Sequence, residues 1–406
     1  MRFDIGGRTY LLSDPADIKH VLIVNADNYD KSPRIIGDRG RRFFGDGVVT
    51  MTGPEHLRQR RILQPLFHRA VIERFASAIV AETESMLDSW QGGGVIDVHQ
   101  EMLEVTQRII GRVLFGDEPQ AELDRFARAI SDRRRYQELY LGSVIPFIDR
   151  LPTRTRHDYR NADRLVDDIV GSGIRRRRAM ASPSADILSM LVHATYEDGT
   201  GMSDTLIRDE ARTLALAGYE TLAEALTWTW FLLAQAPAEA QTVASEASSV
   251  PADRRIVAAD VPRLSHCRMV LAEAIRLYPP TWIFLRMAHE DDVLPSGIRV
   301  PAGTKIYLCP WVLHRDPRHF PDPERFDPAR FSDGAARARP RLAYLPFGAG
   351  RRVCIGEDFA WMQGVLMIAT ISRRFRLELV PGQSIVPDPN VTLRPSGAIR
   401  MRTVRR

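Results

Sequence analysis

The chain has 406 residues, of which 44% are hydrophobic and 26% charged, as is typical of a soluble globular protein. No stretch approaches the roughly 18 uninterrupted apolar residues of a membrane span, and the start MRFDIGGRTYLLSDP lacks the order of a secretion signal, so we expect a cytoplasmic protein. The net charge of +5 comes mostly from arginines scattered among almost as many acids, which favours docking of an acidic protein partner over nucleic-acid binding.

The chain opens on a predicted β-hairpin, FDIGGRTYLL, with Gly6 and Gly7 in its turn. Helical periodicity then dominates from Asp14 to about Phe331, with helices separated by loops such as residues 151–156. Two arginine runs fall in these helical segments and are expected to be solvated faces: Arg133–Arg135 and Arg175–Arg178.

The clearest long helix is predicted from an N-cap at Ser203 to about Gln235, just before Pro237. Its centre is apolar almost all round, so it should cross the core. Short strands are predicted at Ile298–Val300, Lys305–Leu308, Phe375–Leu379 and Ile399–Arg402. The sequence therefore predicts a mainly α fold with a small β component, and one domain over residues 1–406.

The middle of the long helix carries an unusual group, Ala217-Gly218-Tyr219-Glu220-Thr221. Glycine is about 1 kcal/mol less favourable than alanine inside a helix. The Thr221 hydroxyl can bond the preceding backbone, and an acid such as Glu220 is costly in an apolar segment. Together they indicate either a local opening of the helix beside a cavity, with a proton-handling pair, or a simple kink around a satisfied polar residue.

Several cations have types and spacings suited to a buried dianion. His56 and Arg60 stand four apart on one helical face, Arg286 follows the double proline 279–280, and Arg352 lies two residues before Cys354. Any one of them is more often a surface charge, so their meaning depends on whether they converge.

Glu273 and Arg276 are three apart on an otherwise apolar helix, so a buried ion pair is predicted. The proline-rich stretch FPDPERFDPARF, residues 320–331, offers Arg325 as a third member.

The three cysteines, Cys267, Cys309 and Cys354, show no CxxC spacing, and no disulfide is expected. Cys354 stands in YLPFGAGRRVCIGEDFA, residues 344–360. The start GAGRRV is not a phosphate loop, because Val353 occupies the third glycine position of GxGxxG. Cys354 instead precedes a helical run whose N-terminus favours a thiolate. It is either such a ligand or a small buried hydrophobe.

The stretches FGAGRRVCIG, AGYET, ExxR and PERF resemble, in type and in order, the motifs of the cytochrome P-450 family of haem-thiolate monooxygenases. The resemblance covers essentially the whole chain and implies that family's fold, with a haem between a long distal helix and a proximal cysteine loop. It implies that Cys354 is the thiolate ligand of the iron of haem b. The haem-binding residues that it implies are His56, Arg60, Arg286, Phe347, Gly348, Arg352, Cys354 and Gly356.

In that resemblance Phe347 shields the sulfur, and Gly350 and Gly356 admit the porphyrin. Ala217 and Gly218 lie beside bound dioxygen, while Glu220 and Thr221 help to deliver protons. Glu273, Arg276 and Arg325 lock the proximal side of the fold. Relatives usually have a longer segment before the first hairpin than this chain has.

The implied reaction inserts one oxygen atom of O2 into a C–H or C=C bond of a hydrophobic small molecule, such as a terpenoid or other secondary metabolite. Electrons from NAD(P)H are expected to arrive through a separate ferredoxin and its reductase, since only 52 residues follow Cys354, and the protein is expected to be a monomer. The expected pocket walls are Val48, Val49, Leu214, Ala217, Thr281, Trp282, Phe284, Val391, Thr392 and Leu393. A peroxide-driven haem-thiolate enzyme, a non-catalytic haem sensor and a nucleic-acid-binding module are the alternatives.

Overall fold

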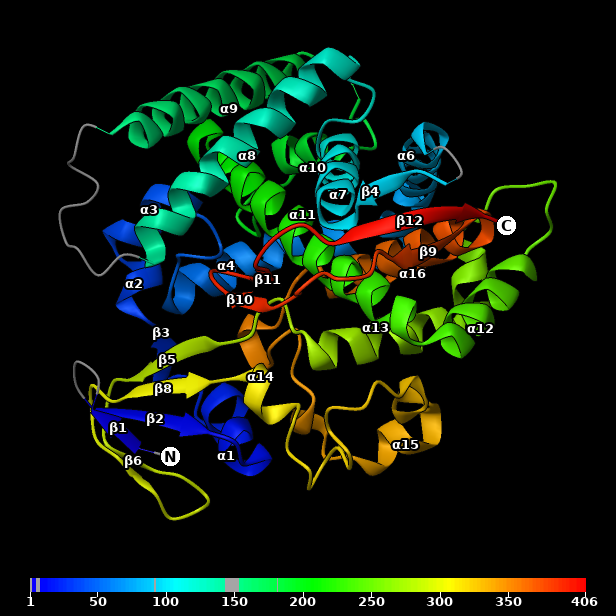
Figure 1. Ribbon diagram of the computed structural model, residues 1–406. Coiled ribbons are helices and arrows are strands. Elements are labelled where there is room, and N and C mark those ends of the chain that lie inside the picture. The colour runs from blue at the N-terminus through cyan, green and yellow to red at the C-terminus, as the bar shows by residue number, and fades with distance from the viewer. Residues whose placement is uncertain (1, 5–7, 91–92, 143–152, 181) are drawn as a thin grey trace. The chain divides into compact units, whose positions relative to one another are not determined.

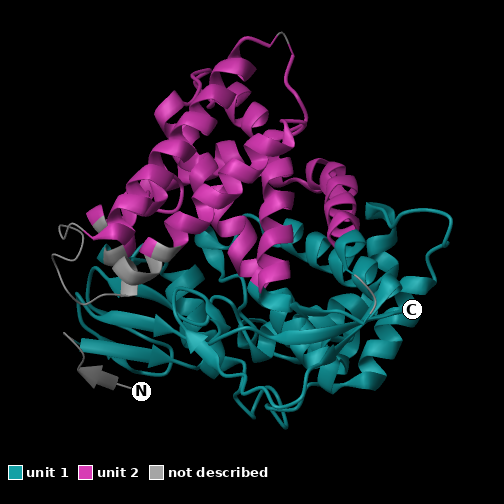
Figure 2. Cartoon of the chain, turned by 45° about the horizontal axis from the view of Figure 1, so that its top comes forward, with its two compact units in different colours: residues 1–33, 87–99, 224–406 teal, residues 34–86, 100–223 magenta. Residues whose placement is uncertain are grey.

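A computed structural model describes residues 2–4, 8–90, 93–142, 153–180 and 182–406 (Figure 1). The chain divides into two compact units, each assembled from segments far apart in the sequence (Figure 2). Unit 1 comprises Met1–Pro33, Leu87–His99 and Glu224–Arg406, and unit 2 comprises Arg34–Met86 and Gln100–Ala223. The single domain over residues 1–406 remains a prediction.

Unit 1 contains the β structure. Its largest sheet has the strand order β1-β2-β8-β5-β3, with β2 and β8 parallel and the other neighbours antiparallel. These strands are β1 (Arg2–Asp4), β2 (Arg8–Leu12), β3 (Tyr29–Lys31), β5 (Phe284–Ala288) and β8 (Lys305–Leu308). The smaller sheets are β4 (Val95–Asp97) with β12 (Arg400–Arg405) and β9 (Phe375–Leu379), β6 (Asp292–Val293) with β7 (Arg299–Val300), and β10 (Pro387–Pro389) with β11 (Leu393–Pro395).

The helices of unit 1 surround α16 (Glu357–Arg374), which is buried continuously from Trp361 to Ser372. It packs against α12 (Pro237–Ser248) and α13 (Ser265–Leu277). The shorter elements are α1 (Pro15–Lys19), η1 (His20–Val24), η5 (Ala258–Arg263), α14 (Pro310–Leu313), η6 (Pro328–Phe331), α15 (Asp333–Ala338), η7 (Arg341–Ala343) and η8 (Gly350–Arg352).

Unit 2 is helical. Its elements, four of which extend into unit 1, are α2 (Pro33–Ile36), α3 (Asp38–Phe44), α4 (Gly53–Leu63), η2 (Gln64–Phe67), α5 (Arg69–Ile72), η3 (Glu73–Phe75), α6 (Ala76–Ser89), α7 (Val98–Phe115), α8 (Gln120–Gly142), α9 (Arg154–Arg178), α10 (Ile187–His193) and α11 (Asp204–Gln235). Helix α11 matches the predicted long helix, and the Ser203 hydroxyl accepts the Leu206 amide at 3.2 Å, as expected of its N-cap.

The predicted secondary structure agrees closely with the structure. Strands β8 and β9 have the predicted bounds, β7 and β12 differ only at their ends, and β1 pairs with β2 as the predicted hairpin. The Gly6-Gly7 turn lies outside the described residues. The predicted loop 151–156 was too long, since α9 begins at Arg154 after an N-cap at Thr153, and residues 151–152 are not described.

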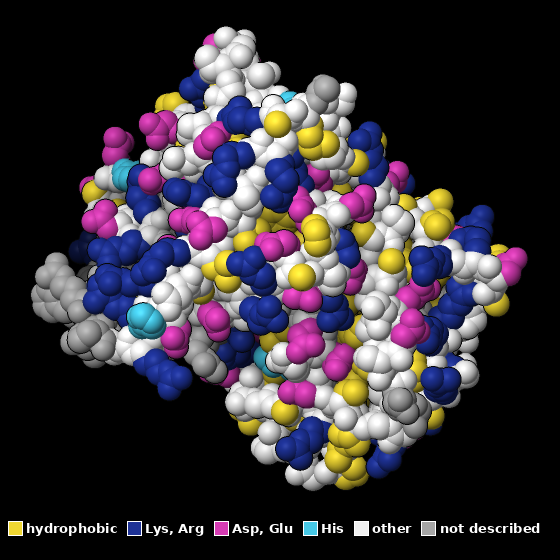
Figure 3. Space-filling model, turned by 90° about the horizontal axis from the view of Figure 1, so that it is seen from above, with side chains coloured by type: hydrophobic (Ala, Val, Ile, Leu, Met, Phe, Trp, Pro, Cys, Tyr) yellow, Lys and Arg dark blue, Asp and Glu magenta, His cyan; other side chains and the backbone are white. Residues whose placement is uncertain are grey.

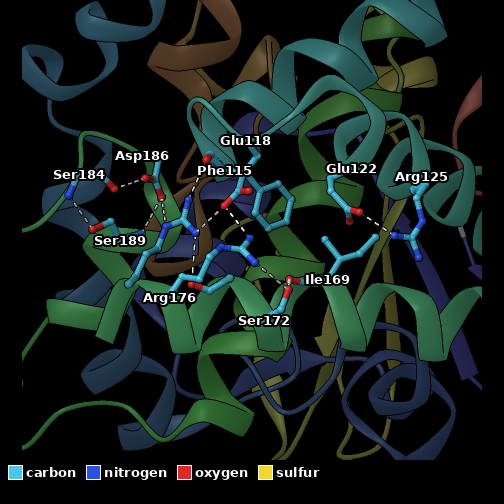
Figure 4. A network of polar contacts seen from close by, with 12 residues as sticks. Phe115, Glu118, Glu122, Arg125, Ile169, Ser172, Arg176, Ser184, Asp186 and Ser189 are labelled. Carbon is cyan, nitrogen blue, oxygen red and sulfur yellow. Dashed lines mark hydrogen bonds and ion pairs between the residues drawn. The ribbon is translucent and has the colours of Figure 1, made fainter. Parts of the chain in front are cut away.

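The prediction that both arginine runs are solvated was wrong for two of their members. Arg133 is 5% exposed and donates to the Phe43 carbonyl at 2.8 Å. Arg177 is 4% exposed, and its Nε lies 2.8 Å from Asp186 Oδ1. Figure 4 shows the polar network between α7, α9 and α10 to which Asp186 belongs. Each guanidinium lies beside a carboxylate and donates to a backbone carbonyl, which offsets part of the cost of burying its charge.

Charges of both signs are interspersed over the face of the molecule shown in Figure 3, as the composition predicts. Among the described residues, no helix is both long enough and apolar enough to cross a membrane.

Candidate active site

Cys354 lies in a tight loop that enters α16. Its amide donates to the Phe347 carbonyl at 2.9 Å, and η8 forms the turn between these two residues. The Cys354 side chain is exposed, whereas Cys267 and Cys309 are buried. The loop therefore presents this thiol three residues before the first residue of α16, where the helix dipole favours a thiolate. A buried hydrophobic role for Cys354 is ruled out.

Gly350 is required by contact between two parts of the backbone. Its φ is +70°, and a Cβ placed there would lie 1.9 Å from the Leu22 carbonyl oxygen in η1. The loop thus rests on η1 at a point where only glycine fits. This contact by itself explains the glycine at position 350, and the expectation that Gly350 admits the porphyrin stays a prediction.

Aromatic side chains support the same loop. The Phe347 and Trp361 rings meet edge to face with centroids 5.4 Å apart, which fixes the start of the loop on α16. The Arg268 guanidinium of α13 lies 4.4 Å from the centroid of the Trp361 ring. Phe347 is half-buried, as a residue shielding the sulfur would be, but that role stays a prediction.

Arg286 and Arg352 converge in unit 1, and a third cation that the sequence reasoning missed joins them. Antiparallel pairing of β3 with β5 places Lys31 directly opposite Arg286. The Arg352 guanidinium lies 2.8 Å from the carboxylate of Asp30, next to Lys31. Like charges placed opposite each other on neighbouring strands repel. Three cations therefore share one carboxylate at the edge of the largest sheet.

The pKa values of these groups reflect the crowding of positive charge. Burial, with Arg352 and Arg286 nearby, lowers the pKa of Lys31 to about 7. Burial, with Arg352 nearby, lowers the pKa of Arg286 to about 10. Three cationic side chains, Lys31, Arg286 and Arg352, thus gather beside the single carboxylate of Asp30. A bound dianion would favour their charged forms.

His56 and Arg60 belong to α4 in unit 2, one helical turn apart. His56 is 4% exposed, and Arg60 donates from Nε to the Gln64 side chain at 3.1 Å. Their predicted part in binding the same anion stays a prediction.

Glu273 and Arg276 form the predicted buried pair. Arg276 donates from Nε and Nη2 to the two carboxylate oxygens at 2.6 and 2.8 Å, and both side chains are 0% exposed. The prediction that the Arg325 side chain is the third member of this group was wrong. The Arg325 side chain is exposed and only its carbonyl accepts from Arg276, whereas Arg330 lies 3.5 Å from Glu273. Residue 325 ends an exposed turn, while 330 lies on η6, which packs against α13.

His314 links this pair to the cysteine loop. Its carbonyl accepts from Arg276 at 2.9 Å, and its Nε2 accepts the Leu345 amide at 2.8 Å, two residues before Phe347. Complete burial, with the Arg276 cation nearby, lowers the pKa of His314 to about 3, so the ring is neutral and able to accept this bond. A lone histidine gave no signal of this role in the sequence.

The group at residues 217–221 lies on an unbroken helix. The Thr221 hydroxyl donates to the Ala217 carbonyl at 2.9 Å, as predicted, but α11 stays α-helical through it, so the predicted opening is not found. The absence of a side chain at Gly218 makes room for Ile110, because a Cβ there would lie 2.7 Å from Ile110 Cδ1. Glu220 is 4% exposed.

One face of α11 is nevertheless open. Ala217 is exposed, and Leu214, Gly218 and Thr221, which share its face, are half-buried, whereas residues 222–230 are all buried. This stretch of α11 is therefore accessible on one face and covered on its other faces. The open face contains the predicted Ala217, Gly218 and Thr221.

The predicted pocket walls form two groups. In unit 1, the Leu393 amide donates to Pro280 and the Trp282 indole to Asn390, so residues 281–284 lie beside residues 391–393. Thr281 and Val391 are exposed, Trp282 and Phe284 half-buried, and Thr392 and Leu393 buried. In unit 2, Val48 donates its amide to Glu210 of α11, one turn before Leu214, and Val49 is half-buried. Their contact with substrate stays a prediction.

Comparison with known proteins agrees with this arrangement. The family model described as Cytochrome P450 matches residues 1–400. Cyclooctatin synthase of Streptomyces melanosporofaciens is 36% identical, over 97% of this chain and 85% of its own length. Pentalenene oxygenase of Streptomyces avermitilis is 32% identical, over 98% of this chain and 88% of its own length.

The solved structure of the cytochrome P450DA heme domain superposes with a TM-score of 0.90 at 24% identity, covering all of this chain and 90% of that one. The predicted family, fold and enzyme class are confirmed: the chain is an oxidoreductase of the monooxygenase class and belongs to the cytochrome P450 family.

Proposed function

We propose that this protein oxygenates a compact, hydrophobic terpenoid, with haem b held by Cys354 and by the cations of unit 1. The observation that carries the proposal is the convergence of three cationic side chains, Lys31, Arg286 and Arg352, beside one carboxylate, that of Asp30. The two propionates of a haem carry two negative charges, and an exposed thiol before a helix N-terminus is a donor suited to the iron. The residues present therefore fit the cofactor.

When bound, the haem supplies the iron chemistry that activates O2 and transfers one oxygen atom to a C–H or C=C bond. Cys354 would hold the iron and donate electron density from its thiolate. Lys31, Arg286 and Arg352 would neutralise the propionates, with Arg60 and His56 as further donors. Phe347 would cover the sulfur and exclude water, and Gly348 and Gly356 would leave the backbone bare beside the cofactor.

The open face of α11 would provide the surroundings of the reacting oxygen. Ala217 and Gly218 leave room there because neither has a large side chain. Thr221, whose hydroxyl is oriented by the Ala217 carbonyl, would pass a proton at Oγ1. The buried carboxyl of Glu220, its neighbour in the chain, would replenish that proton.

The substrate class is supported by the side chains and by the relatives. Five of the expected pocket walls are apolar, with branched or aromatic side chains: Val48, Val49 and Leu214 in unit 2, and Trp282 and Phe284 in unit 1. Two relatives are named for terpenoid oxygenation, cyclooctat-9-en-7-ol 5-monooxygenase at 35% identity and pentalenene oxygenase.

A spin-state titration of the holoprotein tests this proposal. Terpenes, macrolides, steroids and aromatic metabolites are added in turn, and the Soret shift is followed. We expect a cyclic terpene to produce the tightest high-spin shift, followed by conversion to an oxygenated product. A macrolide or steroid that binds more tightly than every terpene would contradict the proposed substrate class.

We further propose that electrons from NAD(P)H arrive through a separate acidic ferredoxin and its reductase, and that the protein acts as a cytoplasmic monomer. Arg268, Arg341 and Arg351 are exposed near the cysteine loop, and the first two lie close enough to Glu357, at the start of α16, to influence its pKa. Such a basic surface suits an acidic partner.

Charge reversal at Arg268 and Arg341 tests the partner. We expect each to raise the ferredoxin KM severalfold and to weaken its salt dependence. Arg376→Glu is the control, because β9 follows the 18-residue α16 and so lies about 27 Å from its first turn. Equal effects of all three variants, or turnover independent of salt, would refute the docking surface.

A further inference from the structure

The segment between α3 and α4 is held by one face of α11. Within residues 44–48, two amides and one carbonyl bond to side chains of that helix. The contacts are Asp46 N to Asp209 Oδ2 at 3.0 Å, Val48 N to Glu210 Oε1 at 2.7 Å, and Thr213 Oγ1 to the Phe44 carbonyl at 2.7 Å. We name residues 44–48 the clasped segment. It has no regular secondary structure of its own after Phe44, so these bonds fix its position together with those of the Thr50 hydroxyl to the Gly45 and Gly47 carbonyls.

Two glycines let the clasped segment approach this closely. A Cβ at Gly45, whose φ is +68°, would lie 2.3 Å from Asp209 Cγ. A Cβ at Gly47 would lie 2.9 Å from Glu210 Cδ and Oε1. Each glycine thus lies directly against one of the two carboxyl groups. A side chain at either position would force either the segment or the carboxyl group out of its present place.

A glutamate at position 210 makes this contact at a high free-energy cost of burial. It is 0% exposed, forms no ion pair with any described residue, and its Oε2 is buried without a hydrogen bond. A neutral amide would accept the same bond from Val48 without the cost of burying a charge. A carboxyl group at this position makes the contact responsive to protonation.

The surroundings of Glu210 are mostly uncharged. Its Oε1 also accepts from Gln59 Nε2 of α4 at 2.8 Å, and Gln59 Oε1 accepts from the Tyr196 hydroxyl at 2.7 Å. The charged and titratable groups around it are Asp209 beside it, Tyr196, Arg58 stacked on the Tyr196 ring, and His56 one turn before Gln59. Burial raises the pKa of Glu210 to about 7, so its neutral form is favoured while it stays buried.

We propose that Glu210 is a positioning residue that sets the width of the substrate pocket by holding the clasped segment, and with it Val48 and Val49, against α11. The inference rests on the proposed function, in which Val48 and Val49 line that pocket. Opening the segment would bring the carboxyl group to water, where it ionises more easily. Rising pH therefore favours release of the segment and entry of larger substrates.

Hydrogen exchange of the holoprotein tests whether Glu210 holds the clasped segment against α11. The rate is compared for a peptide covering residues 44–50 in the wild type, Glu210→Gln, Glu210→Ala and Gly47→Ala. Gln keeps the acceptor without the charge, so Glu210→Gln should stay closed at every pH. We expect wild type to match Glu210→Gln near about pH 4.5 and to exchange at least about 10-fold faster near about pH 8.

The other two variants, Glu210→Ala and Gly47→Ala, each change one partner of the same contact. Glu210→Ala removes the acceptor and Gly47→Ala pushes the segment off, so both should exchange about 10- to 100-fold faster than Glu210→Gln at either pH. Asp186→Asn is the control, since it breaks a buried pair in the same unit without touching the clasped segment. Unchanged exchange in Glu210→Ala and Gly47→Ala, or an equal rise in the control, would overturn the hold.

Ligand titration tests the width of the pocket. The dissociation constants of a bicyclic monoterpene and a four-ring steroid are measured from the Soret shift. We expect Glu210→Ala and Gly47→Ala to shift the ratio at least about 10-fold toward the steroid, and Asp186→Asn to leave it unchanged. Faster exchange with an unchanged ratio would overturn the pocket role. If no terpenoid shifts the wild-type spectrum, the proposed function is wrong, and so is the role of Glu210 in setting the pocket width. The exchange rates still decide whether Glu210 holds the clasped segment against α11.

Discussion

Replacement of Gly350 by alanine should destabilise the cysteine loop more than replacement of another glycine, such as Gly348, by alanine. The φ of +70° is left-handed, which costs an L-residue about 1–2 kcal/mol. The new Cβ would lie 1.9 Å from the Leu22 carbonyl oxygen. Since real Cβ contacts are not shorter than 3.0 Å, the loop and η1 must separate by at least 1.1 Å, the difference of the two values.

This separation cannot be absorbed by a rotamer change, because both partners are backbone. Forced displacement in a packed region costs about 1–3 kcal/mol, so the total should reach about 2–5 kcal/mol. The assay is urea unfolding of the holoprotein, followed together with the fraction that retains the thiolate spectrum. We expect a lower urea concentration at the unfolding midpoint and a smaller fraction with the thiolate spectrum, because Cys354 belongs to the same loop.

Two other glycines separate the clash from the backbone strain. Gly348 has a φ of +69° and its Cβ would meet only the Arg352 carbonyl at 4.0 Å, while Gly382 has a φ of +80° and nothing within 4 Å. Alanine at either position should cost about 1–2 kcal/mol. If Gly350→Ala unfolds at the same urea concentration as Gly348→Ala, the reasoning about the Leu22 contact is refuted.

Three further predictions follow from charges. Arg330→Gln should lower the free energy of unfolding by about 1–3 kcal/mol and Arg325→Gln by less than about 0.5, because only Arg330 lies near the buried carboxylate; equal losses would restore Arg325 to the triad. Lys31→Met should speed haem loss to a globin acceptor about 10-fold, and Lys305→Met on the same sheet should not; equal rates would remove Lys31 from the site. Since the pKa of Glu210 is raised from 4.5 to about 7, stability should fall by about 3 kcal/mol as pH rises between these values, and Glu210→Gln should abolish this fall; an unchanged slope would contradict it.

Much of the fold could be predicted because its signals are local. The bounds of β8 and β9 follow from short apolar runs, and the start of α11 from the Ser203 cap. Cys354 was identifiable because its loop combines glycines, a cation and a following helix within a few residues. Burial of Arg133 and Arg177 was not predictable, because it depends on carbonyls and carboxylates contributed by other helices.

In the candidate site, too, features set by neighbouring residues could be predicted, and features set by tertiary packing could not. The Glu273–Arg276 pair is three residues apart on one helix, so spacing predicts it. The choice between Arg325 and Arg330 depends on which part of a proline-rich turn faces α13, and spacing does not decide that. Lys31 was missed because it is one charge in a three-residue strand, and only strand pairing places it opposite Arg286.

The most direct test of the central claim is the spectrum of the reduced CO complex of the wild type and of Cys354→Ala. If Cys354 is the thiolate ligand, the wild-type protein gives the red-shifted Soret band typical of thiolate ligation, and the variant loses it. Cys309→Ala, which removes a buried thiol, should keep the band. A wild-type protein without the red-shifted band, or a Cys354→Ala variant that retains it, would contradict the account.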